Sequence, residues 1–410
     1  MLLYIDPGTG SMLFSIVIGL VTMLYFVGKA AIIKLKFIIS GGKSAGDHHR
    51  YPLVIYSEGK RYWNIFLPIL NALEQRGMDT VFLTSSQDDP FFSQKYEHVK
   101  GEFIGEGNKA FTRLNFLEAD VCLMTTPGLD VYQLKRSKGV KHYAHILHAV
   151  DDATSYRLFG LDYFDSVLLS GEYQKEHIRL LEKQRGIKEK ELVVVGCPYL
   201  DILQEKAKDL LQKKSDQFTV LVAPSWGASG ILSRYGASLL DQLVATDFSI
   251  IVRPHPQSRQ SEKEILEALE RRYKDTPNLQ WDHAVENLVS LSRADIMISD
   301  FSGVIFDYAF LFNRPFLYVN ASFDSRPYDA YDVPEQPWKF RILPQIGVEL
   351  KEEEEFFRIR EVLLETVGNQ TLRENRNAAK AKAWQNQGES GDRVADFLMQ
   401  FIDGNTELRQ

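Results

Sequence analysis

Short apolar runs alternate with helical stretches along this 410-residue chain, and this alternation restricts its fold more than any other feature. The first series of predicted strands is Leu53–Tyr56, Thr80–Leu83, Val121–Thr125, His142–His148, Ser166–Ser170 and Leu192–Val195. The second series is Thr219–Ala223, Ser249–Arg253, Leu279–Trp281, Ile296–Ser299 and Pro315–Val319. Strands that alternate with helices in this way predict a parallel, doubly wound sheet. We therefore expect an α/β protein with two Rossmann-like domains.

The helices expected between these strands complete both series. They are Trp63–Gln75, Phe111–Leu117, Tyr173–Lys183, Leu200–Lys214, Leu239–Thr246, Glu262–Lys274, Val285–Ser292, Val304–Leu311 and, near the end, Gly391–Phe401. The expected domains are residues 46–214 and 215–410, preceded by an anchor and linker over residues 1–45. Two such domains imply a cleft between them, and ligands should bind where the strands end at their carboxyl edges.

Composition and charge exclude some classes of partner. The net charge is −7, and no basic stretch is interleaved with aromatic residues, so nucleic acid is not an expected partner. A nucleotide substrate remains open, because an acidic protein can still bind one locally. The only two cysteines, Cys122 and Cys197, lie in apolar or turn-like stretches, which favours a reducing compartment over a structural disulfide.

The N-terminal segment has the sequence of a membrane anchor. Twenty-two uncharged residues separate Asp6 from Lys29, enough for a helix of roughly 30 Å. Basic residues follow this run and only Asp6 precedes it, which predicts a single pass with the remaining chain in the cytoplasm. The alternative is a monotopic hairpin or an interfacial helix, since Ala30–Ile39 is itself amphipathic.

Arg253-Pro254-His255-Pro256 directly follows a predicted strand of the second series. The two prolines fix the backbone, which suits a histidine that must transfer a proton or contact a phosphate. Arg253 offers a planar fork of donors that matches phosphate oxygens. The alternative interpretation is a surface turn with no function.

Asp300-Phe301-Ser302-Gly303 follows the next-to-last predicted strand and precedes a predicted helix. Small residues at that place let backbone amides approach an anion, and the helix dipole favours negative charge there. Ser299 and Ser302 add hydroxyl donors, although Ser302 could simply cap the helix.

The run from Ala223 to Gly230 also follows a strand. It contains Ser225 and Trp226, and the indole offers a face for a base or a sugar, but a structural loop would have the same composition.

Three histidines in the first series, His142, His145 and His148, are spaced by three residues. On a helix they would share a face and could bind a metal, but the surrounding residues favour a strand, on which His145 points away from the other two. No metal site is therefore expected. His148, at the end of the predicted strand, is a candidate general base; the alternative is a buried histidine with internal partners.

The second series resembles the CDP-glycerol glycerophosphotransferase family of teichoic acid synthesis. The resemblance is carried by Arg253-Pro254-His255-Pro256, Ser299–Tyr308, Arg314-Pro315-Phe316 and Gly196–Asp201. It implies a two-domain glycosyltransferase-B fold, no metal or other cofactor, a CMP leaving group and contact between His255 and the donor phosphates. The chain departs from the family where Gly303 replaces a serine, where Tyr199 replaces an arginine, and in the residues around His148.

From this resemblance we expect a transferase with an acceptor side in residues 46–214 and a nucleotide-donor side in residues 215–410. His148 and His255 would be catalytic, whereas Arg253, Ser225, Trp226, Ser299, Asp300, Ser302 and Gly303 would bind the donor. The group transferred would be glycerol phosphate or a related polyol phosphate, and the acceptor would be lipid-linked. Two alternatives are a glycosyltransferase that uses a nucleotide sugar for capsule or lipopolysaccharide synthesis, and an inactive nucleotide-binding membrane scaffold.

Overall fold

The computed structural model describes residues 18–28, 50–210, 217–320, 323–351 and 353–402. The chain divides into two compact units, Met1–Arg50 and Tyr51–Gln410. Residues 18–28 of the first unit are helical, and the rest of the predicted anchor and linker, residues 1–17 and 29–45, lies outside the described residues. Among the residues that are described, no helix has both the length and the apolar character needed to cross a membrane.

The second unit begins with a seven-stranded sheet in which every strand pair is parallel. Its strands are β1 (Tyr51–Ser57), β2 (Thr80–Thr84), β3 (Val99–Phe103), β4 (Glu118–Met124), β5 (Gly139–Ile146), β6 (Ser166–Leu169) and β7 (Glu191–Val194). Their order is β3-β2-β1-β4-β5-β6-β7. The buried residues of β1 form a run, Leu53 to Ser57, as expected for a central strand covered on both faces.

A second parallel sheet follows in the same winding order. Its strands are β8 (Thr219–Val222), β9 (Ser249–Val252), β10 (Leu279–Trp281), β11 (Ile296–Ser299), β12 (Phe316–Tyr318) and β13 (Val348–Glu349). They are ordered β10-β9-β8-β11-β12-β13. The predicted α/β class with two doubly wound parallel sheets is therefore confirmed.

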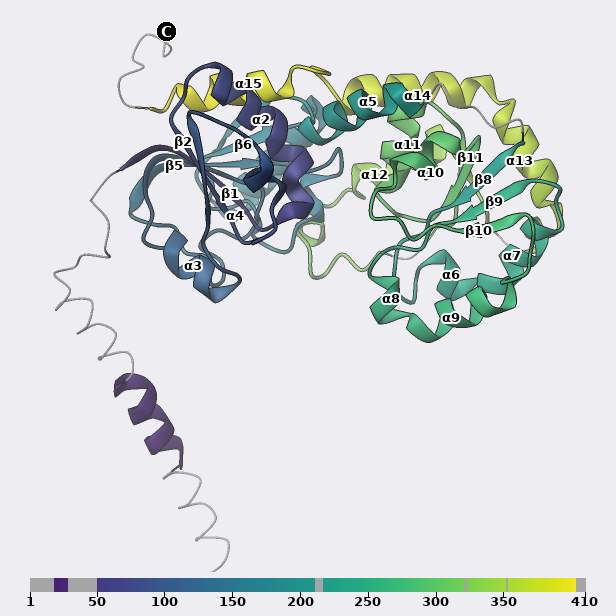
Figure 1. Cartoon of the computed structure of the whole chain (residues 1–410), viewed down its shortest axis with the longest axis horizontal. Coiled ribbons are helices and arrows are strands. Elements are labelled where there is room, and N and C mark those ends of the chain that lie inside the picture. The colour runs from purple at the N-terminus through teal and green to yellow at the C-terminus, as the bar shows by residue number, and fades with distance from the viewer. Residues whose placement is uncertain (1–17, 29–49, 211–216, 321–322, 352, 403–410) are drawn as a thin grey trace, which may run out of the picture. The chain divides into compact units, whose positions relative to one another are not determined.

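Helices cover both sheets, and their apolar residues lie in the cores beneath them (Figure 1). They are α2 (Trp63–Gln75), α3 (Asn108–Leu114), α4 (Lys175–Arg185), α5 (Pro198–Leu210), α6 (Ile231–Arg234), α7 (Gly236–Val244), α8 (Ser258–Ser261), α9 (Lys263–Arg272), α10 (Leu288–Arg293), α11 (Val304–Phe312), α12 (Trp338–Ile346), α13 (Ile359–Val367), α14 (Gln370–Ala383) and α15 (Ser390–Met399).

The C-terminal helix α15 returns to the first sheet and packs on α2 (Figure 1). Val394 and Leu398 are fully buried in the same core cluster as Leu53 and Phe66. A Cβ atom on Gly391 would lie 2.5 Å from the carbonyl oxygen of a residue in α2, so only glycine allows this close approach. The last part of the range predicted for the second domain thus covers the first sheet.

The segment that joins β12 to α12 is fastened to the first sheet's half of the molecule. Asp152 accepts hydrogen bonds from the backbone amides of Trp338 and Lys339, at 2.8 and 2.9 Å, and so caps the N-terminus of α12. Arg185 of α4 forms ion pairs of 2.7 Å with Asp329 and Asp332. These contacts bring residues far apart in sequence to the border between the two sheets.

Candidate active site

The strand order of the second sheet reverses between β8 and β11, which lie side by side. In open parallel sheets ligands bind outside the carboxyl ends of the strands at such a reversal. The loop of residues 223–230 follows β8, and residues 300–303 follow β11. Two of the predicted segments therefore meet at the place where this fold binds ligands.

Asp300 joins these two segments. Its side chain is 1% exposed. It accepts hydrogen bonds from the backbone amide and hydroxyl of Ser225, at 3.0 and 2.7 Å, and from the amides of Ile231 and Ser302, at 3.0 and 3.2 Å. These internal donors occupy both carboxylate oxygens. Asp300 thus fixes the shape of the loop and of the turn into α11, rather than presenting a free carboxylate.

His255 and Trp226 lie on facing loops, with ring centroids 6.4 Å apart and an interplanar angle of 34°. Half of the Trp226 surface is exposed, so the indole face is open to a ligand. The Nδ1 atom of His255 accepts a hydrogen bond of 3.1 Å from the backbone amide of Gln257, so the neutral ring carries its hydrogen on Nε2. Burial lowers the pKa of His255, while Glu262 and Asp300 act in the opposite direction. The neutral imidazole can therefore donate a hydrogen bond through Nε2.

Arg253 is directed into the protein. Its guanidinium donates to Asp282 at 2.5 Å and to the backbone carbonyls of Ala284 and Val285 at 2.8 and 3.2 Å. These bonds hold the loop after β10 beside the loop after β9. The role in donor binding expected for Arg253 remains a prediction, and binding a phosphate would require these internal partners to be exchanged.

The turn from β11 into α11 contains the remaining predicted residues. Ser299 is fully buried, and its hydroxyl donates to the carbonyl of Ala223 at 2.6 Å, which ties the two loops together. Ser302 is only partly buried and Gly303 is exposed. A Cβ atom on Gly303 would meet nothing within 4 Å, so the space beside the first turn of α11 is open. The N-terminus of α11 faces this opening and favours an anion there.

His148 lies on the other half of the molecule, just beyond the end of β5 and exposed to solvent. Its Nδ1 atom lies 3.1 Å from the hydroxyl of Tyr156, and the same hydroxyl lies 3.0 Å from Nε2 of His145. The ring of Tyr62 contacts His148 edge to face, with centroids 6.0 Å apart. One edge of the His148 ring is open to water, but the rest of the ring is covered by protein, and this burial lowers the pKa of His148. Asp151 and Glu58 act to raise this pKa, and Arg61 acts to lower it.

The predicted arrangement of the three histidines was wrong in one respect. His145 and His148 should point to opposite faces of a strand, but β5 ends at Ile146 and the chain then turns. The turn brings both rings to the Tyr156 hydroxyl. His142, by contrast, stacks on Phe401 at 3.8 Å between centroids, far along the strand from this contact.

Sequence reasoning missed the residues that hold His148. Tyr156 follows it by eight residues and carries no motif, and Tyr62 comes from the loop after β1. Nothing in the sequence signals either contact, because the topology of the sheet brings these loops together. Asp300 is bonded to both Ser225 and Ser302, and His255 and Trp226 face each other on neighbouring loops; their expected roles in donor binding remain predictions.

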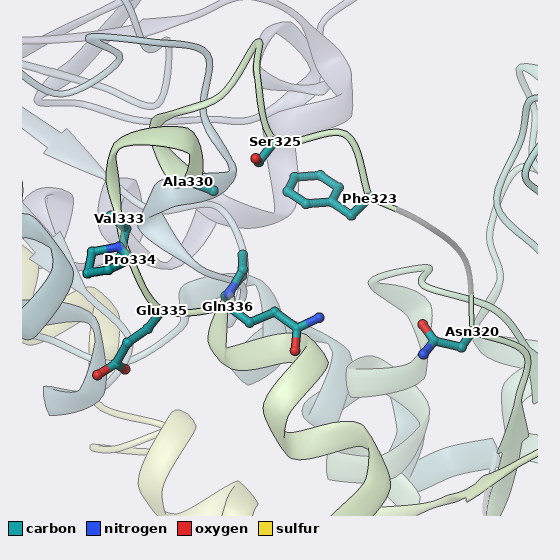
Figure 2. A pocket seen from close by; sticks show the side chains of 9 residues that line it. Asn320, Phe323, Ser325, Ala330, Val333, Pro334, Glu335 and Gln336 are labelled. Carbon is teal, nitrogen blue, oxygen red and sulfur yellow. The ribbon is translucent and has the colours of Figure 1, made fainter.

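A separate open cavity of about 570 Å³ lies beside the segment that joins β12 to α12 (Figure 2). The amide groups of Asn320 and Gln336 point into it, and the ring of Phe323 lies above them. It shares none of its lining residues with the predicted donor-binding set.

The chain matches a protein family described as CDP-Glycerol:Poly(glycerophosphate) glycerophosphotransferase over residues 158–334. This range contains Arg253, His255 and residues 300–303, but it begins after His148 and Tyr156. No curated protein shows significant sequence similarity to the chain.

Solved structures share its fold. The wall teichoic acid polymerase TagF is 14% identical, with a TM-score of 0.55 and coverage of 88% of this chain and 90% of that one. UDP-GlcNAc 2-epimerase from Methanocaldococcus jannaschii is 15% identical, with a TM-score of 0.53 and coverage of 85% and 99%. A glycosyltransferase from Rickettsia africae ESF-5 is 12% identical, with a TM-score of 0.51 and coverage of 87% and 100%.

At these identities the structures show a common two-sheet α/β fold of the glycosyltransferase-B type. The family match, by contrast, includes the sequence motifs at residues 253–256 and 300–303. Over residues 158–334, the predicted resemblance of this chain to the CDP-glycerol glycerophosphotransferase family is confirmed.

Proposed function

We propose that this protein transfers glycerol phosphate, or a related polyol phosphate, from a CDP-activated donor to a membrane-linked acceptor in the synthesis of a cell-envelope polymer. The observation that carries the proposal is the junction of residues 223–230 with residues 300–303 through Asp300, at the strand-order reversal of the second sheet. The family match covers both of these segments.

The donor phosphates would lie between the Trp226 loop and the N-terminus of α11. Three features support this placement: the turn with partly buried Ser302 and exposed Gly303, the dipole of α11, and the Nε2–H group of His255. Trp226 would contact the base or the ribose. Hydrogen bonds to the phosphate oxygens would become stronger as negative charge develops on the leaving CMP.

The reaction would be a displacement at the phosphorus that carries the polyol. A hydroxyl oxygen of the acceptor forms the new bond to this phosphorus, and the bond to the oxygen bridging the two phosphates breaks. CMP leaves with that bridging oxygen, and the proton of the acceptor hydroxyl passes to Nε2 of His148. The lowered pKa of His148 supports this role, because the imidazole is then unprotonated at neutral pH.

The acceptor would be lipid-linked and the catalytic unit cytoplasmic. The support for this part of the proposal is the uncharged run before Lys29 and the basic residues that follow it. A tether of this kind would keep the catalytic residues close to a substrate confined to the bilayer.

A panel of activated donors tests the proposal. The full-length protein, purified in mild detergent, is incubated with CDP-glycerol, CDP-ribitol, UDP-N-acetylglucosamine or a CMP-sugar, together with a synthetic lipid that ends in glycerol phosphate. Release of CMP from a CDP-polyol and growth of the lipid by one polyol phosphate are expected. Turnover of the sugar donors alone would overturn the proposal in favour of a glycosyltransferase.

Alanine variants of the two proposed catalytic histidines distinguish an enzyme from an inactive scaffold. His148→Ala and His255→Ala are made singly, and each should abolish envelope polymer synthesis in cells that depend on this protein. A scaffold would retain its cellular role in both variants, provided that each accumulates to the level of the wild type.

A further inference from the structure

We infer that Tyr156 and His145 are positioning residues that hold His148 in the tautomer with hydrogen on Nδ1 and a free lone pair on Nε2. This inference rests on the proposed role of His148 as the general base. It concerns residues outside the family match, which begins at residue 158.

The geometry places one hydroxyl between two imidazoles. The Tyr156 oxygen lies 3.0 Å from Nε2 of His145 and 3.1 Å from Nδ1 of His148, both within hydrogen-bond range. A phenol has a single hydrogen, so it can donate to at most one of these nitrogens and must accept from any nitrogen to which it does not donate. Burial raises the pKa of Tyr156, which keeps that hydrogen on the oxygen.

Three proton arrangements satisfy both contacts; in one of them Tyr156 accepts from both histidines and turns its own hydrogen to the Thr125 side chain. The other two differ in which histidine receives the hydroxyl hydrogen. In the first, Tyr156 donates to Nε2 of His145 and accepts from an N–H on Nδ1 of His148. In the second, Tyr156 donates to Nδ1 of His148, whose hydrogen then lies on Nε2. The first arrangement leaves the outer nitrogen of His148 able to accept a proton, as does the one in which Tyr156 accepts from both histidines, whereas the second does not.

The surroundings of His145 favour the first arrangement. His145 is fully buried, and burial lowers its pKa to about 3, so its ring is neutral and has one N–H. In the first arrangement that N–H lies on Nδ1. The backbone of Thr126 lies beside the ring and acts to raise this pKa, as expected for a carbonyl near an N–H, although Nδ1 has no partner that meets full hydrogen-bond geometry. Nε2 faces the Tyr156 hydroxyl, so an N–H directed at this backbone would lie on Nδ1, and the second arrangement leaves Nδ1 without a hydrogen.

Tyr156 is itself held from the other half of the molecule. Its carbonyl accepts a hydrogen bond of 2.9 Å from the amide of Asp329, and the neighbouring Arg157 pairs with Tyr328 in an isolated antiparallel bridge. Asp329 is fixed in turn by Arg185 at 2.7 Å. The position of the hydroxyl that orients His148 thus depends on the segment between β12 and α12, which directly follows a strand of the second sheet.

Histidine tautomers can be measured without any substrate. The full-length protein is labelled with ¹⁵N at its nine histidines, and two-bond ¹⁵N–¹H correlations are recorded in detergent at pH 8. Loss of one set of signals in His148→Gln assigns His148. The wild type should show hydrogen on Nδ1 of His148, and Tyr156→Phe should move the population toward the Nε2–H form.

Tyr143→Phe is the matched control. Tyr143 is a buried tyrosine of β5, the strand that contains His145, but its hydroxyl accepts from the amide of Ser137 and contacts neither histidine. Removal of the Tyr143 hydroxyl should leave the His148 signals unchanged. An Nε2–H form of His148 in the wild type would overturn the inference, and this result needs no variant to fold.

Kinetics give a second readout if the donor panel shows transfer. Tyr156→Phe should lower kcat by roughly 10- to 100-fold with little change in KM, a part of the 10²–10⁴-fold contribution of a well-placed general base. An unchanged kcat would contradict a positioning role. If the wild type shows no transfer, the proposed function is refuted but the inference about His148 is not, because the tautomer measurement does not require activity.

Discussion

Replacing Asp300 by asparagine should destabilise the donor side while preserving the size of the side chain. One carboxylate oxygen accepts from the Ser225 hydroxyl and the Ser302 amide, the other accepts from the Ile231 amide, and the two share the Ser225 amide. In Asp300→Asn, an amide oxygen can replace the first, but an NH₂ group must then face the Ile231 N–H. Two donors would point at each other in a site that is 1% exposed.

The magnitude follows from these contacts. Loss of a charge-assisted hydrogen bond costs about 2 kcal/mol, and a buried N–H without an acceptor costs about 1 kcal/mol more. We therefore expect the free energy of unfolding to fall by about 3 kcal/mol. The loop of residues 225–230 should also loosen, and this would raise the KM for the donor.

Urea unfolding followed by tryptophan fluorescence measures the change, since Trp226 lies in the affected loop. Ser299→Ala is the control: it removes one buried neutral hydrogen bond, to Ala223, and should cost about 1 kcal/mol. A free energy of unfolding for Asp300→Asn within 0.5 kcal/mol of the wild type would refute the reasoning.

Three further predictions concern single residues. Because burial lowers the pKa of His148, log kcat/KM should rise with pH, with a midpoint below 6.5; a pH–rate profile with a midpoint above that value would contradict this. Burial raises the pKa of Asp307 to about 7, so the native state binds the extra proton between pH 4 and 7 and stability falls as pH rises through that range. At pH 8, thermal unfolding should therefore show Asp307→Asn to be more stable than the wild type by about 2 kcal/mol. This is about half of the free energy that corresponds to the whole pKa shift, because the side chain keeps some contact with water. Equal stability of the two proteins would count against a buried charge at Asp307. Gly303→Ser should change the free energy of unfolding by less than about 0.5 kcal/mol, since its Cβ meets nothing, and should lower the donor KM; a rise in KM would show that the space is needed by the donor.

The fold was largely predictable because its strands are short, apolar and buried on both faces. The helix expected over Trp63–Gln75 and the strand over Ile296–Ser299 have these bounds in the structure. β3 was missed because only Val99 among its five residues is buried, so an edge strand of this kind has no apolar run. The packing of α15 on the first sheet could not be predicted, since an amphipathic helix does not indicate which surface it covers.

The candidate site was predictable only in part. Its positions followed from a simple rule, that polar residues directly after parallel strands share one edge of the sheet. Their internal partners did not: Arg253 and Asp300 have charged side chains typical of ligand-binding residues, yet both are bonded within the protein. The contact of Tyr156 with His145 and His148 depends on a turn after Ile146 that no local pattern indicates.

Mass analysis of the reaction product tests the central claim most directly. Full-length protein is incubated with CDP-glycerol and the synthetic lipid that ends in glycerol phosphate, and the lipid product is examined for a new phosphodiester. We predict lipid lengthened by glycerol phosphate in amounts equal to the CMP released, and none with His148→Gln. CMP released without lengthened lipid, or equal transfer by His148→Gln, would contradict the account.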